Sequence, residues 1–344
     1  MQSRSRPLRS AALLPACLLL VAGCIKPDPK THSNFTAYSN TPDAAAPMPD
    51  ATPPNFDTAP PPPSDGGTTV GCGMEPGQAG GQYVEYKMNV AGPDLDGNNQ
   101  PKVRERTYFV RLPASYDPSI PYRVIYIGPG CGGTTPQSVL RLFTVTGEDA
   151  ILVAIMPLTE FGQCFDETMA SVEYPFFDAL HKKIESTFCV DANRQFYAGF
   201  STGARLAYML DCTFPDVLRA VGAIQGAQPP LPTCKKDPIG LFVIADTMET
   251  GNPYMANVMA TSRLFTQNSC TGTFISPMPP AGCGAACTTY DTMTMAPLPP
   301  TTTCVKYTGC PADGPIVFCS TIGQGHQTFE PWSDQALWNF FKAF

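Results

Sequence analysis

Short, nearly uninterrupted apolar runs recur along the chain after residue 100. Runs this apolar are typical of strands that are buried on both faces of a parallel sheet. The segments that predict strands are 106–112, 122–128, 151–156, 195–200, 220–224, 240–245 and 316–322.

The stretches between these strands carry apolar residues at helical spacing. In 173–188, Phe177, Leu180 and Ile184 recur at intervals of three and four, and the same pattern predicts helices over 201–213 and 334–344. Alternation of strands and helices predicts an α/β fold with a doubly wound, mostly parallel sheet. The segment 268–314 interrupts the alternation and is rich in Pro, Thr, Gly and Cys. We expect it to be a disulfide-stapled insertion near the carboxyl ends of the strands, where substrate clefts usually lie.

The first residues have the pattern of a secretory signal. Three arginines precede the apolar run Ala11–Ala22, and small residues lead to Cys24. The run is too short to span a bilayer. Cysteine at the cleavage junction resembles a bacterial lipobox, which implies a lipoprotein-type signal over 1–23 and a lipid anchor on Cys24. Ordinary cleavage nearby is the alternative.

A proline-rich segment follows the signal. Residues 24–70 combine many prolines with Thr, Asp, Ala and Ser, and offer too little apolar surface to offset the entropy of ordering. We expect a disordered, extended linker. The folded part is then a single domain over 71–344.

Cysteine usage agrees with export. Of 14 cysteines, Cys17 lies in the signal and Cys24 is the anchor candidate, so 14 − 2 = 12 remain for the domain. An even number in an exported chain predicts disulfides, conceivably six. Zinc is disfavoured, because the spacings lack a second CxxC pair or clustered histidines. The net charge of −7 and pI near 5.0 argue against nucleic acid as a partner.

A nucleophile motif stands between a predicted strand and a predicted helix. Residues 199–203 read Gly-Phe-Ser-Thr-Gly, which matches G-x-S-x-G in the strand–turn–helix context that the motif requires. Ser201 is therefore the candidate nucleophile. The helix that follows directs its positive end to the site, which makes the Thr202 amide a candidate oxyanion donor.

One histidine of three fits the required base. His32 lies in the linker, and His181 lies inside a predicted helix upstream of Ser201. His326 follows the last strand, as expected for the chain order Ser, acid, His. The acid should follow the strand 240–245, where Asp246 and Glu249 are both possible.

The region around Ser201 resembles the nucleophile region of secreted feruloyl esterases and polyhydroxybutyrate depolymerases, which belong with the first carbohydrate esterase family. The matching stretch runs from Phe188 (FCVDANRQFYAGFSTGARLAY), and counterparts of the family's other loops are 129–133, 163–165, 245–254 and Gly325-His326. The resemblance covers about 106–338. It implies an α/β-hydrolase fold, with the disulfide-rich insertion before the catalytic histidine.

The resemblance also implies roles for individual residues. Without gaps, Glu249 falls on the family's catalytic aspartate and Asp246 on a glycine, which favours Glu249 as the acid and leaves Asp246 as the runner-up. Pro129 stands where the family has histidine, and proline has no amide hydrogen. The Cys131 amide is then the expected partner of Thr202 in the oxyanion hole. The elbow also departs from the family at Ala204, which replaces a glycine.

These inferences predict an exported serine carboxylic ester hydrolase that needs no metal or organic cofactor. Its expected substrate is an aromatic, feruloyl-type ester of plant cell-wall polysaccharide, and its membrane contact is through lipidated Cys24. Alternatives are a polyhydroxybutyrate or other polyester depolymerase and an acetyl xylan esterase. A peptidase, or a catalytically inactive surface-binding lipoprotein of the same fold, are alternatives of other classes.

Overall fold

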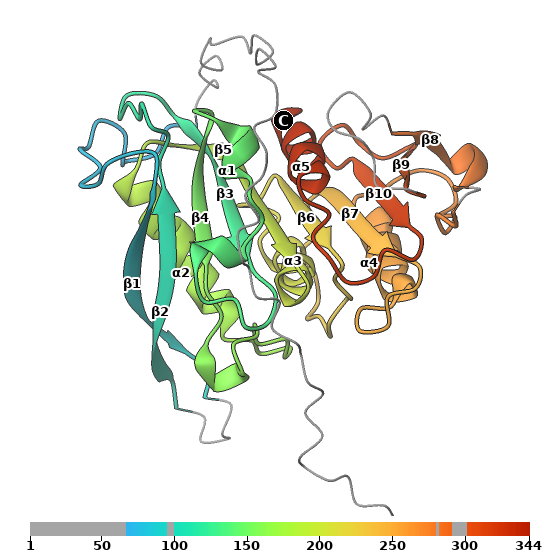
Figure 1. The fold of residues 1–344 in the computed structure, drawn as a ribbon, viewed down its shortest axis with the longest axis horizontal. Coiled ribbons are helices and arrows are strands. Elements are labelled where there is room, and N and C mark those ends of the chain that lie inside the picture. Colours follow the sequence, from blue (N-terminus) through green and yellow to red (C-terminus); the bar gives the residue numbers. More distant parts are fainter. Residues whose placement is uncertain (1–66, 95–99, 280–281, 291–300) are drawn as a thin grey trace, which may run out of the picture. The chain divides into compact units, whose positions relative to one another are not determined.

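A computed structural model describes residues 67–94, 100–279, 282–290 and 301–344 (Figure 1). The predicted signal, Cys24 and the predicted linker up to residue 66 lie outside these ranges. Among the described residues, no helix combines the length and apolarity needed to cross a membrane.

The described residues form one mixed sheet. Its spatial order is β1-β2-β4-β3-β5-β6-β7-β10-β9-β8. The six central strands, β4, β3, β5, β6, β7 and β10, are parallel to one another. The remaining neighbours, β1 with β2, β2 with β4, β10 with β9 and β9 with β8, pair antiparallel. The strands are β1 Tyr83–Gly92, β2 Lys102–Arg111, β3 Tyr122–Gly128, β4 Ala150–Ile155, β5 Val190–Phe200, β6 Ala220–Ile224, β7 Gly240–Asp246, β8 Cys287–Thr289, β9 Thr303–Tyr307 and β10 Ile316–Thr321. The central strands are buried throughout, as their apolar sequences require.

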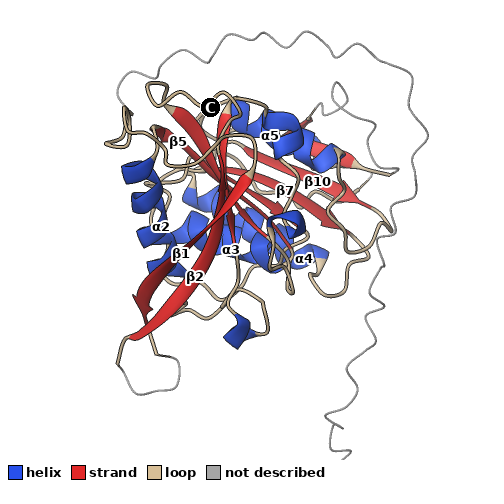
Figure 2. Cartoon of the chain, turned by 60° about the vertical axis from the view of Figure 1, so that its left-hand side comes forward, coloured by secondary structure: helices blue, strands red, loops and turns tan. Residues whose placement is uncertain are grey.

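Helices cover both faces of the sheet (Figure 2). Helices α2, α3 and α4 contribute to one hydrophobic core, and α5 contributes to a second core on the other face. The helices are α1 Phe143–Thr146, α2 Glu173–Thr187, α3 Thr202–Thr213, α4 Tyr254–Gln267 and α5 Trp332–Lys342, with short 3₁₀ turns at Pro136–Ser138, Thr159–Phe161 and Gly284–Ala286. The predicted doubly wound α/β architecture is confirmed.

Each strand and helix predicted from the sequence is present, with bounds shifted by a few residues. Five helices and strands were not predicted, namely the edge strand β1, the short helix α1, helix α4, and the strands β8 and β9, and the three 3₁₀ turns were not predicted either. Ordered structure also begins slightly before the expected start at Gly71. Thr68 forms a bridge with Asp191, and the Thr69 amide donates to Val190 O.

Six disulfides join the cysteines of the described domain, as the sequence predicts. The pairs are Cys72–Cys189, Cys131–Cys164, Cys212–Cys234, Cys270–Cys310, Cys283–Cys287 and Cys304–Cys319. The last three lie in the predicted insertion or tie it to β10. Because all twelve cysteines of the described domain are in these disulfides, none of them is available as a thiolate ligand for zinc.

The insertion is only partly where the sequence placed it. Its strands β8 and β9 extend the sheet sideways beyond β10, which the prediction did not foresee. The part of the insertion around Pro277 does reach the carboxyl end of β10. There, Pro277 O accepts hydrogen bonds from the hydroxyl groups of Tyr254 and Ser320. Burial raises the pKa of Tyr254 to about 12, so its phenol stays protonated as a donor.

Candidate active site

The predicted site residues gather at the carboxyl ends of β5, β7 and β10. Ser201 follows β5, Glu249 follows β7, and His326 lies in the loop between β10 and α5. Carboxyl ends of parallel strands share one edge of the sheet, which explains why residues so distant in sequence meet here.

The nucleophile elbow, residues 199–203, has the backbone strain that its motif requires. Ser201 adopts φ 56° and ψ −118°, a conformation costly for a residue with a side chain. Its amide donates to Ile224 O at 3.0 Å, which ties the turn to the end of β6. The Arg205 amide donates to Ser201 O at 3.0 Å and closes the first turn of α3.

Both elbow glycines stand where a side chain would collide with backbone. A Cβ on Gly203 would lie well inside van der Waals contact with Gly128 O and 2.7 Å from Pro129 O. A Cβ on Gly199 would lie 2.8 Å from the Ala204 amide nitrogen. The Tyr197 hydroxyl donates to Gly203 O at 3.0 Å and fixes this close approach. The elbow is thus held by packing within and immediately around the motif.

The predicted oxyanion loop, residues 129–133, lies directly against the nucleophile. A Cβ on Gly130 would stand 3.2 Å from Ser201 Cβ, so only glycine leaves space for a substrate carbonyl here. The Cys131–Cys164 disulfide and a 2.8 Å hydrogen bond from the Gly132 amide to Gln163 O hold the loop in place. Among described residues, no hydrogen bond occupies the amides of Cys131 and Thr202.

His326 and Glu249 face each other. Glu249 Oε2 lies 3.1 Å from His326 Nδ1, and the glutamate side chain is 7% exposed while the histidine side chain is 37% exposed. The imidazole also packs on the ring of Phe200, with centroids 4.6 Å apart. No direct hydrogen bond from the Ser201 hydroxyl to the imidazole is among the contacts of the described residues. Catalytic hydrogen bonds are often long in the absence of substrate and tighten when it binds.

Asp246, the runner-up acid, is engaged elsewhere. Its Oδ2 accepts from Thr321 Oγ1 at 2.7 Å and from the Gln324 amide at 2.8 Å, and its Oδ1 accepts from the Met248 amide at 2.9 Å. The side chain is fully buried. Its hydrogen bonds therefore shape the acid loop (residues 246–253) and the histidine loop (residues 322–327).

Gln225 is a site residue that the sequence did not suggest. It follows β6, is fully buried, and has a positive φ of 54°. Its side-chain Nε2 donates to Gly325 O at 2.8 Å, and its side-chain Oε1 accepts from the Asp246 backbone amide at 3.1 Å. It thereby joins the acid and histidine loops. Its only sequence signal is a polar residue at the end of an apolar strand.

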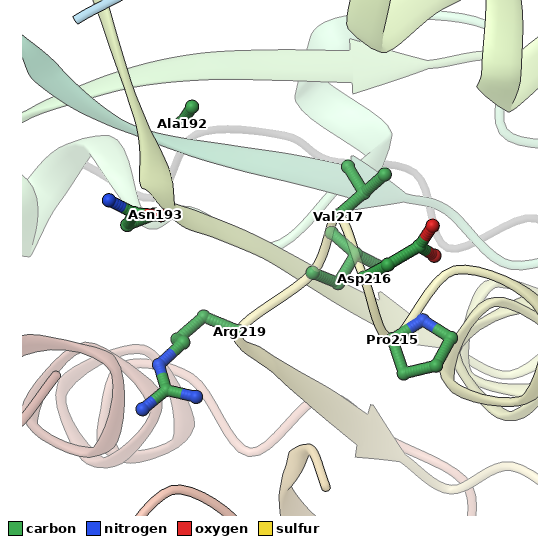
Figure 3. A pocket seen from close by; sticks show the side chains of 7 residues that line it. Ala192, Asn193, Pro215, Asp216, Val217 and Arg219 are labelled. Atoms are coloured by element: carbon green, nitrogen blue, oxygen red, sulfur yellow. The ribbon is translucent and has the colours of Figure 1, made fainter. Parts of the chain in front are cut away.

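Other candidates lie away from this edge. His181 is buried in α2, within 3.6 Å of Asp178 and Glu185 carboxylate oxygens, and has a structural role. A pocket of about 390 Å³ lies at the opposite edge, at the amino ends of β5 and β6 (Figure 3). It is lined by Asn193, Asp216, Arg219 and their neighbours, none of which belongs to the predicted site.

Comparison with known proteins places this chain among esterases. None of the protein-family models compared with the sequence matches it. Feruloyl esterase D of Neurospora crassa is 24% identical over 300 residues, which cover 80% of this chain and 90% of the relative. Feruloyl esterase C of Emericella nidulans is 25% identical over 297 residues, covering 82% and 93%. The chain is a carboxylic ester hydrolase related to the feruloyl esterases.

The fold of this esterase is that of an α/β-hydrolase, as predicted. Acetyl xylan esterase from Aspergillus awamori superposes with a TM-score of 0.51, at 13% identity over 75% of this chain and all of the neighbour. At that identity the likeness shows the fold alone.

Proposed function

We propose that this esterase hydrolyses esters through an acyl-enzyme on Ser201, with His326 as the base and Glu249 as the orienting acid. The observation that carries the proposal is the 3.1 Å contact between Glu249 Oε2 and His326 Nδ1, at the same sheet edge as the strained Ser201. Asp246 is not proposed as the acid, because its two oxygens already accept three hydrogen bonds.

The proposed reaction has two acyl-transfer steps. Ser201 Oγ attacks the ester carbonyl while His326 Nε2 takes its proton, and Glu249 holds the Nδ1–H tautomer and stabilises the imidazolium. The amides of Cys131 and Thr202 receive the oxyanion, at about 3 kcal/mol per donor in comparable enzymes. His326 returns the proton to the leaving alcohol, and water then hydrolyses the acyl-enzyme by the same route. These groups suffice without a metal or organic cofactor.

We further propose an aromatic, feruloyl-type ester of plant polysaccharide as the substrate. The names of the sequence relatives support this class. The surface next to the acid supports it too. Met248 precedes Glu249, is 68% exposed, and has its sulfur against Gly323 of the histidine loop. An exposed, polarisable thioether next to the histidine loop is a suitable contact for an aromatic acyl group.

Export to an oxidising compartment agrees with the six disulfides. We propose lipidation of Cys24 as the means of membrane attachment, with residues 24–66 as the spacer. Expression of Cys24→Ala in a bacterial host that processes lipoproteins tests this. The wild-type protein should fractionate with membranes and the variant should be released. Equal release of both would exclude the anchor.

The test of the catalytic proposal is labelling with a fluorophosphonate together with assays on a panel of substrates. Wild type should be labelled and should hydrolyse methyl ferulate faster than acetylated xylan, 3-hydroxybutyrate oligomers or peptide amides. Ser201→Ala should lose labelling and lower kcat by on the order of 10⁴-fold or more. Full activity of Ser201→Ala would exclude the mechanism, and a preference for another panel member would change the substrate class.

A further inference from the structure

The guanidinium of Arg205 connects three segments around the site. Arg205 lies in α3, one turn after Ser201, and its side chain is 26% exposed. Nε donates to Asn252 Oδ1 at 2.8 Å, Nη2 donates to Gly251 O at 3.1 Å, and Nη1 donates to Glu167 Oε2 at 2.7 Å. The first two acceptors belong to the acid loop, and the third follows Cys164.

The contacts to the acid loop lead directly to the proposed acid. Glu249 Oε1 accepts from the amides of Gly251 and Asn252, at 2.6 and 3.2 Å, while its Oε2 faces His326. The same two residues accept from Arg205. Arg205 therefore holds the Gly251–Asn252 peptide group, whose amide donates to the carboxylate, together with the Asn252 side chain, and connects the helix of the nucleophile to the acid.

The contact to Glu167 reaches the oxyanion side of the site. Glu167 lies shortly after Cys164, whose disulfide to Cys131 holds the predicted oxyanion loop. The Arg205 side chain is 26% exposed and the Glu167 side chain is 25% exposed, so the ion pair between them is partly shielded from water. One side chain of α3 thus contacts the acid loop and the segment that follows Cys164.

We infer that Arg205 is a positioning residue, which sets the distance between the acid loop and the nucleophile helix and so keeps Glu249 on His326. The inference rests on the proposed function of Ser201, His326 and Glu249. It requires the planar, multidentate fork of arginine, because the acceptors lie in three directions around one group. A lysine ammonium keeps the charge and loses that fork.

The inference predicts a specific kinetic signature. Arg205→Ala should lower kcat on methyl ferulate by about 10- to 100-fold, since small displacements of positioned groups cost this much. KM should stay within about twofold, because Arg205 acts on the transition state through Glu249. Arg205→Lys should recover part of the loss, and added guanidinium at non-denaturing concentration should raise kcat of Arg205→Ala only.

Two controls separate positioning from general stability. Arg263 is the matched control: it lies in α4, is 19% exposed, and pairs with the buried Asp211 at 2.5 Å near the far end of α3. Arg263→Ala should lower the melting temperature and leave kcat near wild type. Glu167→Gln should retain more kcat than Arg205→Ala, since it keeps both contacts to the acid loop.

The outcomes distinguish this inference from the mechanism beneath it. If Ser201→Ala abolishes activity and Arg205→Ala keeps wild-type kcat, the positioning role is wrong and the proposed mechanism stands. A loss of kcat that Arg263→Ala reproduces at the same loss of melting temperature also overturns the role. If Ser201→Ala remains active, the proposed function fails irrespective of Arg205.

Discussion

The nucleophile elbow and the acid loop lie at the same sheet edge and are held in place by different means. The elbow is held by local backbone packing, with Gly199 and Gly203 in contact with neighbouring chain and Ser201 at a positive φ. The acid loop is held by hydrogen bonds with remote side chains: Arg205 donates to it, and Gln225 Oε1 accepts from its Asp246 amide.

This difference determines how each region tolerates change. Steric fixation fails when any atom is added, because the elbow has no space for it. Fixation by hydrogen bonds fails when a donor or acceptor is removed, because the buried partner is left unsatisfied. Variants of the two regions should therefore show opposite sensitivities to size and to polarity.

The largest expected effect comes from the acid itself. Glu249→Gln keeps the size of the side chain and removes the charge that faces His326, so kcat should fall by on the order of 10³- to 10⁴-fold. The melting temperature should change little, because a side-chain oxygen can still accept from the amides of Gly251 and Asn252. Steady-state kinetics and thermal unfolding measure the two effects.

Asp246→Asn is the matched carboxylate variant. It should cost about 1–3 kcal/mol of unfolding free energy, because the hydrogen bond to Thr321 is buried and the one to Gln324 is partly buried. Its kcat should exceed that of Glu249→Gln. The reverse order of kcat would reassign the acid to Asp246.

A larger side chain should be tolerated differently by the elbow and by the acid loop. Gly203→Ala places a methyl group against Gly128 O and should cost about 3 kcal/mol or lose soluble protein. Gly251→Ala, in the acid loop, meets one side-chain atom and no backbone, namely Glu249 Oε1 at 3.1 Å, and should cost about 1 kcal/mol or less. Chemical denaturation compares them. Equal costs would show that the acid loop is also fixed by packing.

The sequence predicted the central fold because each element there carries its own signal. Strands buried on both faces are uniformly apolar, so β3, β6 and β7 were predicted nearly to the residue. β1 is buried on one face at most, and exposed Met255 and Met259 mask the amphipathic pattern of α4. β8 and β9 depend on disulfide pairings, which a sequence does not specify.

The site residues also differ in whether the sequence carries a local signal for them. Ser201 and His326 were predicted from a local motif and from chain order. The choice between Asp246 and Glu249 could not be made from spacing, since Asp246 ends β7 and Glu249 follows three residues later. Their roles differ through partners such as Thr321 and Gln324, which are remote in sequence. Gln225 was not predicted for the same reason, because its hydrogen-bond partners Gly325 and Asp246 are also remote in sequence.

A polarity change should affect the acid loop more than the elbow. Gln225→Met keeps the volume of the side chain and leaves Gly325 O and the Asp246 amide without their partner. We expect a cost of about 2 kcal/mol in stability and about a tenfold loss of kcat as both loops loosen. Gln327→Met is the control, since Gln327 is exposed and its side chain makes a single hydrogen bond within the described residues, to Gln324 O at 2.8 Å. A loss of equal size in both variants would contradict the joining role of Gln225.

The smallest expected effect tests whether the acid loop also selects the substrate. Met248 is exposed, so Met248→Ala should leave stability within about 0.5 kcal/mol of wild type. Loss of a sulfur–aromatic contact of about 0.3–1.5 kcal/mol should lower kcat/KM for methyl ferulate by about two- to tenfold and leave an acetyl ester unaffected. Met259→Ala removes an equally exposed methionine from α4 and should leave both esters unaffected. Equal losses on both esters in Met248→Ala would mean that the methionine acts through Glu249 on catalysis and does not contact the acyl group.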